Sequence, residues 1–180
     1  MSVESFAVFE TPLGCAGIAW SERGVAGVQL PEPDAAAARA QLRGRFPRAV
    51  ESSPPAHIEE VIDAITALLH GQPSDLSGVE LDMERVSAFE RRVYDITRTI
   101  PVGETVSYGQ IARRLGDPRY ARLAGQALAR NPFALVVPCH RVIAAGGRLG
   151  GFSARGGLAT KQRLLSIERA TVSWQLPLSG

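Results

Sequence analysis

The chain has 180 residues, of which 45% are apolar and 21% charged, as is typical of a globular protein that buries a substantial core. No run approaches the roughly 20 consecutive apolar residues of a membrane span, and Met1 is not followed by a basic and then an apolar segment. We therefore expect a cytoplasmic protein without a membrane partner. The two cysteines, Cys15 and Cys139, lie far apart and outside any CxxC pair, which argues against a structural disulfide and a metal site.

The net charge of +2 hides an uneven distribution along the chain. Residues 1–83 contain 5 basic and 12 acidic residues (net −7), whereas residues 84–180 contain 15 and 6 (net +9). All the basic residues except Lys161 are arginines, whose planar side chains donate two hydrogen bonds to one phosphate. Genome composition explains the preference for arginine but not this segregation. The second half is thus a candidate for binding a polyanion.

The first half is predicted to combine a small sheet with helices. Residues 5–30 form three apolar segments separated by turn residues, which predicts a small antiparallel sheet. Asp34 begins an alanine-rich helix that runs to about Phe46, and a second helix with one apolar stripe ends at Gly71. Residues 78–83 resemble one more strand. We place the domain boundary there, which predicts an α/β domain of residues 1–85.

The second half, residues 86–180, is predicted to be mostly helical. Ser87 and Glu90 have the spacing of a capping box before an amphipathic helix. Two short helices joined at Gly116 follow, the second opened by Asp117, as in a helix-turn-helix. An apolar segment, a glycine-rich segment and a last helix over about residues 160–169 complete the chain.

The segment VVPCHRV, residues 136–142, raises the question of what Cys139 does. A cysteine acts as a nucleophile only as the thiolate, and its ordinary pKa of about 8.5 leaves it mostly protonated at neutral pH. His140 could lower that value, but neighbours on a strand point to opposite faces, so the chain must turn after Pro138 for the two to cooperate. A small buried cysteine beside an unrelated histidine is the other interpretation.

The motifs around this pair resemble those of one protein family. The string NPFALVVPCHRV, preceded by PVGETVSYGQIA and YARLAGQALAR and followed by TKQRLLSIE, resembles the O6-alkylguanine-DNA alkyltransferases, or methylated-DNA–protein-cysteine methyltransferases. The resemblance is close over residues 86–169 and covers the first 85 residues only in general layout. It implies a ribonuclease-H-like first domain and a winged-helix-like, helix-turn-helix second domain.

The resemblance also implies a reaction and its residues. Cys139 matches the cysteine that takes the alkyl group from guanine O6 and keeps it as a thioether, so that each molecule reacts once and without a cofactor. His140 matches the histidine that removes the thiol proton through a water, and Glu168 the glutamate that orients it. Tyr108 matches the tyrosine whose hydroxyl donates a hydrogen bond near the purine ring and whose bulk helps to rotate the nucleotide.

The implied partner is double-stranded DNA that contains O6-alkylguanine. The protein is expected to be a monomer without an obligate protein partner. Arg122 matches the arginine that enters the base stack when the damaged nucleotide rotates out. Neighbouring arginines are expected to contact the DNA backbone, and small residues of the same helix to allow close approach in the minor groove. These residues are Arg113, Arg114 and Arg119, and Ala121, Ala124 and Gly125.

The substrate pocket is expected to involve Asn131, Val142, Phe152 and Ser153. Asn131 matches an asparagine that ties the helix end to the active-site segment, whereas Val142 and Ser153 match positions whose backbone contacts the purine. The loop after Phe152 is about two residues longer than is usual in the family, and Phe152 replaces a common tyrosine. Arg141 is interpreted as an internal structural arginine, and Cys15 as a packing residue.

Two other functions stay open at this point, and the presence of Cys139 argues against a third. A helix-turn-helix regulator could use Cys139 as an alkylation or redox sensor. A Cys-His hydrolase would turn over repeatedly, whereas an alkyltransferase reacts once. A lesion-binding relative that does not repair lacks the cysteine.

Overall fold

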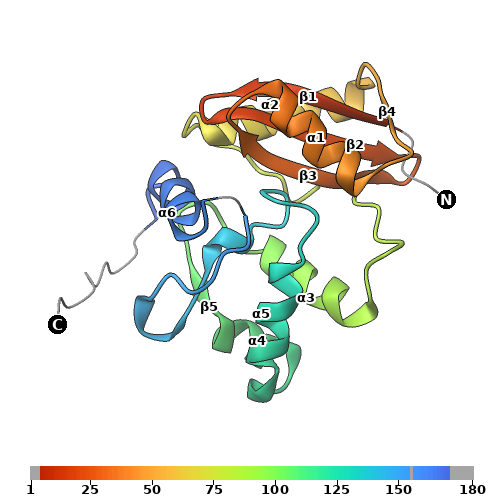
Figure 1. The fold of residues 1–180 in the computed structure, drawn as a ribbon. Helices are drawn as coiled ribbons and strands as arrows, with labels where there is room; N and C mark the ends of the chain where they lie inside the picture. Colours follow the sequence, from red (N-terminus) through yellow and green to blue (C-terminus); the bar gives the residue numbers. More distant parts are fainter. Residues whose placement is uncertain (1–4, 155, 171–180) are drawn as a thin grey trace. The chain divides into compact units, whose positions relative to one another are not determined.

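The computed structural model of the protein describes residues 5–154 and 156–170 (Figure 1). These residues fall into two compact units, one formed by the chain up to Val86 with Pro132–Val136, the other by Ser87–Asn131 and the chain from Val137 onward. Residues 1–4, Arg155 and the tail 171–180, which belong to the two predicted domains, lie outside the described residues. No helix among the described residues is both long and apolar enough to span a bilayer.

The sheet of the first unit is mixed. Strands β1 (Ser5–Thr11), β2 (Gly14–Ser21) and β3 (Gly24–Glu32) form the antiparallel meander that the sequence predicts. The short strand β4 (Val50–Glu51) pairs in parallel with β1 and gives the order β3-β2-β1-β4 (Figure 1). Strand β4 is not predicted from the sequence, because a two-residue strand carries no periodic signal of its own.

Two helices complete the core of this unit. Helix α1 (Ala35–Arg45) begins where the Asp34 carboxylate accepts the Ala37 N–H at 2.8 Å, as expected from the sequence. It packs across β1–β3, and Leu42 occupies the space above Gly17 that any larger side chain would fill. The sequence predicts one apolar stripe on helix α2 (Ala56–Leu69), and the helix buries all of it except the half-buried Ile62: Ile58, Val61, Ile65, Leu68 and Leu69.

The predicted strand over residues 78–83 is wrong. Only Leu81 forms a bridge, with Val25, and the hydrogen bonds from Val25 N to Glu80 O and from Asp82 N to Val25 O make up that single contact. The Asp82 carboxylate then accepts the Ser21 hydroxyl at 2.6 Å and the N–H of Glu84 at 3.0 Å. These side-chain bonds turn the backbone away from the sheet after one residue.

Residues 132–136 are tied to the first unit by Arg45, whose guanidinium lies at the end of α1. The Pro132 carbonyl accepts hydrogen bonds from Val28 N and from Arg45 Nη2, both at 2.9 Å. Arg45 Nη1 donates to the Val28 carbonyl at 3.0 Å and to the Gln29 side chain at 3.2 Å, and Phe133 is fully buried. Burial lowers the pKa of Arg45 below its usual value.

The second unit begins with the predicted capping box. Ser87 Oγ accepts the Glu90 N–H, and the Glu90 carboxylate accepts the Ser87 N–H, at the start of helix α3 (Ala88–Arg98). Tyr94 of this helix is almost completely buried and donates its hydroxyl hydrogen to the Ala127 carbonyl at 2.9 Å. Helix α3 therefore fixes the end of the helix that carries Ala127.

The predicted helix pair follows. Helix α4 (Tyr108–Leu115) has a second capping box, between Ser107 and Gln110, and ends at Gly116, whose φ of 103° favours glycine. A 3-10 turn over Pro118–Tyr120 leads into helix α5 (Ala121–Ala129), so the single predicted helix from Asp117 is two elements. Helix α6 (Leu158–Ile167) is the last, and strands β5 (Val106–Ser107) and β6 (Val142–Ile143) form a parallel pair.

Replacing Arg45 by methionine should destabilise the protein strongly, because three oxygen acceptors lose their charged donor. We expect the free energy of unfolding to fall by about 2–3 kcal/mol, measured by urea denaturation. Arg43→Met is the matched control, since Arg43 is exposed in the same last turn of α1 and should change stability by less than about 0.5 kcal/mol. Equal losses in the two variants would contradict the role of Arg45.

Candidate active site

Cys139 lies in a tight turn of the chain rather than on a strand. After Pro138, whose ψ of 65° redirects the backbone, residues Cys139–Arg141 form a 3-10 turn closed by a hydrogen bond from Arg141 N to the Pro138 carbonyl at 2.9 Å. The N–H of Cys139 donates to the Val137 carbonyl at 2.8 Å. The turn after proline that the sequence required is thus present. It removes the alternation of a strand, which would have kept Cys139 and His140 on opposite faces.

His140 forms a buried pair with Glu168. Its Nε2 lies 2.7 Å from Glu168 Oε1, and the two residues are 1% and 8% exposed. Arg141 donates to both oxygens of the same carboxylate at 2.8 Å, and through Nη1 to the Ile100 carbonyl at 2.7 Å. Arg141 therefore has the internal structural place expected for it, and Glu168 holds both residues that follow Cys139.

The pKa values in this cluster follow from burial and hydrogen bonding. Burial alone would raise the pKa of Glu168, but the hydrogen bonds from His140 and Arg141 lower it to about 2. Burial lowers the pKa of His140 below its usual value, although Glu168 opposes this. His140 is therefore neutral at physiological pH and donates Nε2–H to the carboxylate, which leaves Nδ1 free to take a proton.

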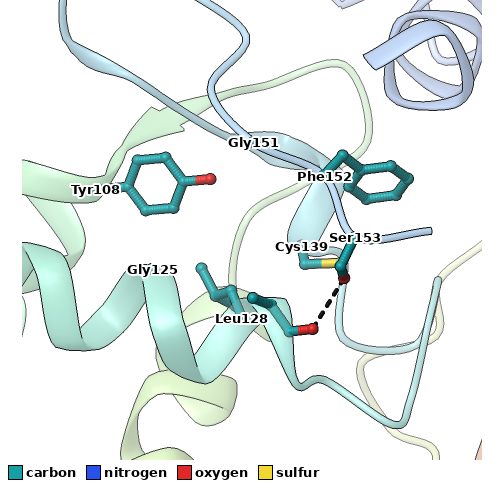
Figure 2. A pocket seen from close by; sticks show the side chains of 8 residues that line it. Tyr108, Gly125, Leu128, Cys139, Gly151, Phe152 and Ser153 are labelled. Atoms are coloured by element: carbon teal, nitrogen blue, oxygen red, sulfur yellow. Dashed lines mark hydrogen bonds between the residues drawn. The ribbon is translucent and has the colours of Figure 1, made fainter. Parts of the chain in front are cut away.

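A cavity of about 430 Å³ opens beside the sulfur of Cys139 (Figure 2). This volume is within the range of small-molecule sites. Figure 2 shows the Tyr108 hydroxyl directed into the cavity from the α4 side, with Phe152 and Cys139 across from it. The lining residues come from α4, α5, the cysteine turn and the glycine-rich loop: Tyr108, Gly125, Leu128, Ala129, Cys139, Gly151, Phe152 and Ser153.

The pKa values of Cys139 and Tyr108 both lie above their usual values, because each side chain is partly shielded from water. Burial is the largest influence on the pKa of Cys139 and raises it, whereas a hydrogen bond from the Asn131 side chain and the charge of Lys161 lower it. Burial also raises the pKa of Tyr108, so its hydroxyl remains a donor. The resting site therefore holds a thiol and a phenol, each of which still carries its proton at neutral pH.

The other predicted pocket residues have structural partners. Asn131 Nδ2 donates to the Val137 carbonyl at 2.9 Å, and Ser153 Oγ donates to the Ala129 carbonyl at 2.8 Å, the contact drawn in Figure 2. Val142 is fully buried and its carbonyl accepts a hydrogen bond from Lys161. Asn131 thus connects the end of α5 to the segment before Cys139.

The predicted DNA-contacting residues divide into exposed and buried ones. Arg113, Arg114 and Arg122 are exposed, and Arg119, also exposed, pairs with Asp117 at 2.6 Å. Gly125 lies next to the Tyr108 ring and Ala121 is half-buried. Ala124 is 0% exposed, so its expected contact with DNA is wrong: it faces the core and allows α5 to pack.

Lys161 is the buried functional candidate that the sequence analysis missed. It is fully buried on α6, on the face that also buries Leu164 and Leu165. The sequence signal that could have identified it is that Lys161 is the sole lysine of the chain and occupies an inward position of an amphipathic helix. Its contacts depend on the tertiary fold and could not be read from spacing.

Comparisons with known proteins agree with this geometry. A family model described as "6-O-methylguanine DNA methyltransferase, DNA binding domain" matches residues 88–170. The methylated-DNA–protein-cysteine methyltransferase of Methanothermobacter thermautotrophicus is 37% identical over 91% of this chain and 85% of its own length. The enzyme of the same name from Mycolicibacterium paratuberculosis is 48% identical over 60% of this chain and 63% of its own.

Solved structures of related proteins have a similar fold. The crystal structure of Mycobacterium tuberculosis O6-methylguanine methyltransferase is similar with a TM-score of 0.73 and 33% identity, over 92% of both chains. A structure of the Mycobacterium tuberculosis protein in complex with DNA gives a TM-score of 0.74 and 32% identity, also over 92% of each chain. With the cysteine turn, the buried histidine–glutamate pair and the cavity beside them, these similarities show that the chain belongs to the methylated-DNA–protein-cysteine methyltransferase family.

Proposed function

We propose that this protein repairs DNA by moving a methyl or small alkyl group from guanine O6 to the sulfur of Cys139, irreversibly and once per molecule. The proposal is carried by the buried hydrogen-bonded pair that His140, the residue directly after Cys139, forms with Glu168. The sulfur of Cys139 borders a cavity large enough for a purine. A thioether resists hydrolysis, so the protein is consumed. The reaction uses only the protein and the alkylated base.

The proton and electron balance of the transfer can be followed atom by atom. The Cys139 thiol gives its proton to His140 Nδ1 through a bridging water, while Glu168 steadies the imidazolium that forms. The sulfur attacks the alkyl carbon, the S–C bond forms as the C–O6 bond breaks, and the electron pair stays on guanine. Guanine then takes up a proton. In sum, the thiol proton replaces the alkyl group on the base.

Tyr108 assists the departure of guanine. Because burial raises its pKa, the phenol stays protonated and offers a hydrogen bond to the purine as negative charge develops there. The hydroxyl is directed into the same cavity as the Cys139 sulfur (Figure 2). The backbone at Val142 and Ser153 and the ring of Phe152 complete the proposed contacts with the base.

The damaged nucleotide must leave the duplex before the sulfur can reach it, at a cost of a few kcal/mol. Arg122, exposed on α5, is proposed to enter the vacated stack. The exposed Arg113, Arg114 and Arg119 are proposed to contact phosphates, with Ala121 and Gly125 allowing close approach in the minor groove. Contacts of this kind carry little sequence information, which suits a repair protein.

The finer assignments complete this proposal. We propose that the first unit is a ribonuclease-H-like scaffold and that α4 and α5 form a winged helix-turn-helix. The mixed sheet with two helices, the Gly116 turn and the β5–β6 pair support these assignments. We further propose that the protein acts in the cytoplasm as a monomer. A regulator that uses Cys139 as a sensor is less favoured, because sensing does not require a purine-sized cavity beside the sulfur.

Mixing the protein with a duplex oligonucleotide that contains O6-methylguanine should add the mass of one methyl group to the peptide that holds Cys139. The increment should stop at one equivalent and be absent in Cys139→Ser, as measured by intact-protein and peptide mass spectrometry. Cys15→Ser is the matched control and should react like the unchanged protein. Repeated turnover without a mass increment would favour a hydrolase, and no reaction would favour a binding protein or regulator.

Arg122→Ala should slow repair of duplex DNA by about tenfold or more, since it removes the group that replaces the extruded base. The reaction with free O6-benzylguanine needs no extrusion and should be nearly unchanged, which stopped-flow or gel assays of Cys139 alkylation can measure. Arg119→Ala, which removes a proposed phosphate contact, should have a smaller effect that diminishes as the salt concentration is raised. If both substrates slow equally, Arg122 does not act on the duplex.

Glu168→Gln should destabilise the protein in a pH-dependent way. Because the folded pKa of about 2 lies below the ordinary 4.5, ionised Glu168 stabilises the fold above pH 4.5, and this contribution is lost as the pH falls towards 2. The variant should be less stable by about 3–5 kcal/mol near neutral pH, with the difference narrowing below pH 4.5, as measured by denaturant titration. A difference independent of pH would contradict the assigned ionisation.

A further inference from the structure

The first unit contains a groove to which the proposed repair reaction assigns no role. It lies between helix α2 and the loop of residues 75–80, with the start of β3 beneath, and its volume is about 380 Å³. This volume is at the lower end of the range for ligand sites. The groove shares no residue with the cavity beside Cys139. We call it the acidic groove, because its exposed side chains include three carboxylates.

The floor of the acidic groove is apolar. Val25, Ile58 and Val61 line it and belong to the buried core of the first unit. The loop opposite α2 is held in place by a hydrogen bond from Ser74 Oγ to the Ala64 carbonyl at 2.7 Å. A side chain that enters the groove would therefore meet an aliphatic surface that is already formed.

Carboxylates line the acidic groove from both sides. Glu60 lines it from α2, whereas Asp75 and Glu80 line it from the loop. The Asp75 carboxylate accepts the N–H of Ser77 at 2.9 Å. No described basic residue forms an ion pair with Glu60 or Glu80. His57, which is exposed, is the only basic side chain among the lining residues. Two carboxylates are therefore available to a cation from another molecule.

The segment that supplies most of the acidic groove carries charge of one sign. Residues 49–84 contain eight acidic residues and neither arginine nor lysine. They account for most of the negative charge of the first half of the chain, which the proposed binding of DNA by the second half does not explain. A surface of this kind repels phosphates and attracts cations. We therefore expect its ligand to be basic rather than a nucleic acid.

An aliphatic floor beside carboxylates matches the two parts of an arginine side chain. The methylene stem can lie on apolar surface while the guanidinium donates charge-assisted hydrogen bonds to carboxylates. A polyamine carries charge along its whole length and would place an ammonium group over the aliphatic floor, which is costly. In a peptide, an aliphatic residue next to the arginine would instead extend the apolar contact.

We propose that the acidic groove binds an arginine-bearing, partly apolar segment of a protein partner. The arginine stem and a neighbouring aliphatic side chain lie on the floor formed by Val25, Ile58 and Val61. The guanidinium binds the carboxylates of Glu60 and Glu80. This inference goes beyond the repair reaction and does not depend on it, because none of these residues belongs to the site around Cys139.

The first test uses the unchanged full chain and a short peptide in which arginine and leucine alternate. A fluorescein-labelled form should bind at physiological ionic strength, as measured by fluorescence anisotropy. With the unlabelled peptide, the ¹⁵N–¹H amide signals of Gly24 and Gly78, which line the groove, should shift. The signal of Gly44, on α1 and outside the groove, should not. Absence of binding, or shifts confined to other residues, would overturn the proposal.

The role of the carboxylates can be tested with the double variant Glu60→Gln, Glu80→Gln. It should weaken binding of the peptide by about tenfold or more, because the guanidinium loses both charged acceptors. The matched control is Glu59→Gln, Asp63→Asn, which removes the same charge from exposed positions of α2 that do not line the groove. It should weaken binding by less than about twofold, since salt screens exposed charges at a distance. Equal losses would show general attraction of charge and overturn the proposal.

The role of the floor can be tested with Ala64→Leu, which changes no charge. Ala64 lines the groove from α2, and leucine favours helix nearly as well as alanine, so the variant should fold with part of the groove filled. Binding of the peptide should weaken about tenfold, and an unchanged affinity would overturn the assignment to the groove. Alkylation of Cys139 by free O6-benzylguanine should be the same in all these variants, so failure of the proposed function would be recognised separately.

Two other occupants of the acidic groove would give different results. Spermine that displaces the peptide and binds at least as tightly would assign the groove to a polyamine. Self-association of the chain that is abolished in Glu60→Gln, Glu80→Gln, as measured by sedimentation velocity, would assign it to a second copy of the protein. Either result would overturn the proposal of an arginine-bearing segment from a protein partner.

Discussion

The arrangement of the active site depends on the carboxylate of Glu168 at the end of α6. Its two oxygens accept hydrogen bonds from His140 and Arg141, and Arg141 in turn reaches the Ile100 carbonyl just beyond α3. Buried charges are tolerated only where nearly every donor and acceptor has a partner, and here the partners come from distant parts of the sequence. This requirement gives the turn around Cys139 one geometry before any substrate binds.

Two opposing influences act on the pKa of the Cys139 thiol. Burial raises the pKa of Cys139 and so limits its reaction with other electrophiles, while the Asn131 side chain and the Lys161 ammonium favour the thiolate. Burial lowers the pKa of His140 and keeps it neutral, as its proposed role as proton acceptor requires. A protein that can react only once benefits from a nucleophile that is largely dormant until a substrate is in place.

Much of the local structure could be predicted because its causes are local. Asp34 and the Ser87–Glu90 pair begin helices through bonds to residues three positions away, and both helices were found where expected. The missed β4 and the wrong strand at 78–83 depend on pairing with distant segments, which a periodic pattern does not encode.

The site shows the same division between local and tertiary information. Cys139, His140, Glu168 and Tyr108 were selected by their sequence motifs, and the structure brings Cys139 and Tyr108 to one cavity and pairs His140 with Glu168. The burial of Ala124 and the two carbonyl contacts of Lys161 arise only when helices pack, so neither could be read from the sequence.

The path of the chain through residues 132–136 means that the two units cannot be separated by one cut in the chain. Because this segment belongs to the first unit while the residues on either side belong to the second, no single peptide bond separates the two. A fragment that begins at Ser87 would carry Phe133 without its buried surroundings, and one that ends at Val86 would leave Arg45 without the Pro132 oxygen. Any single cut of the chain therefore leaves at least one of the two units without all of its residues.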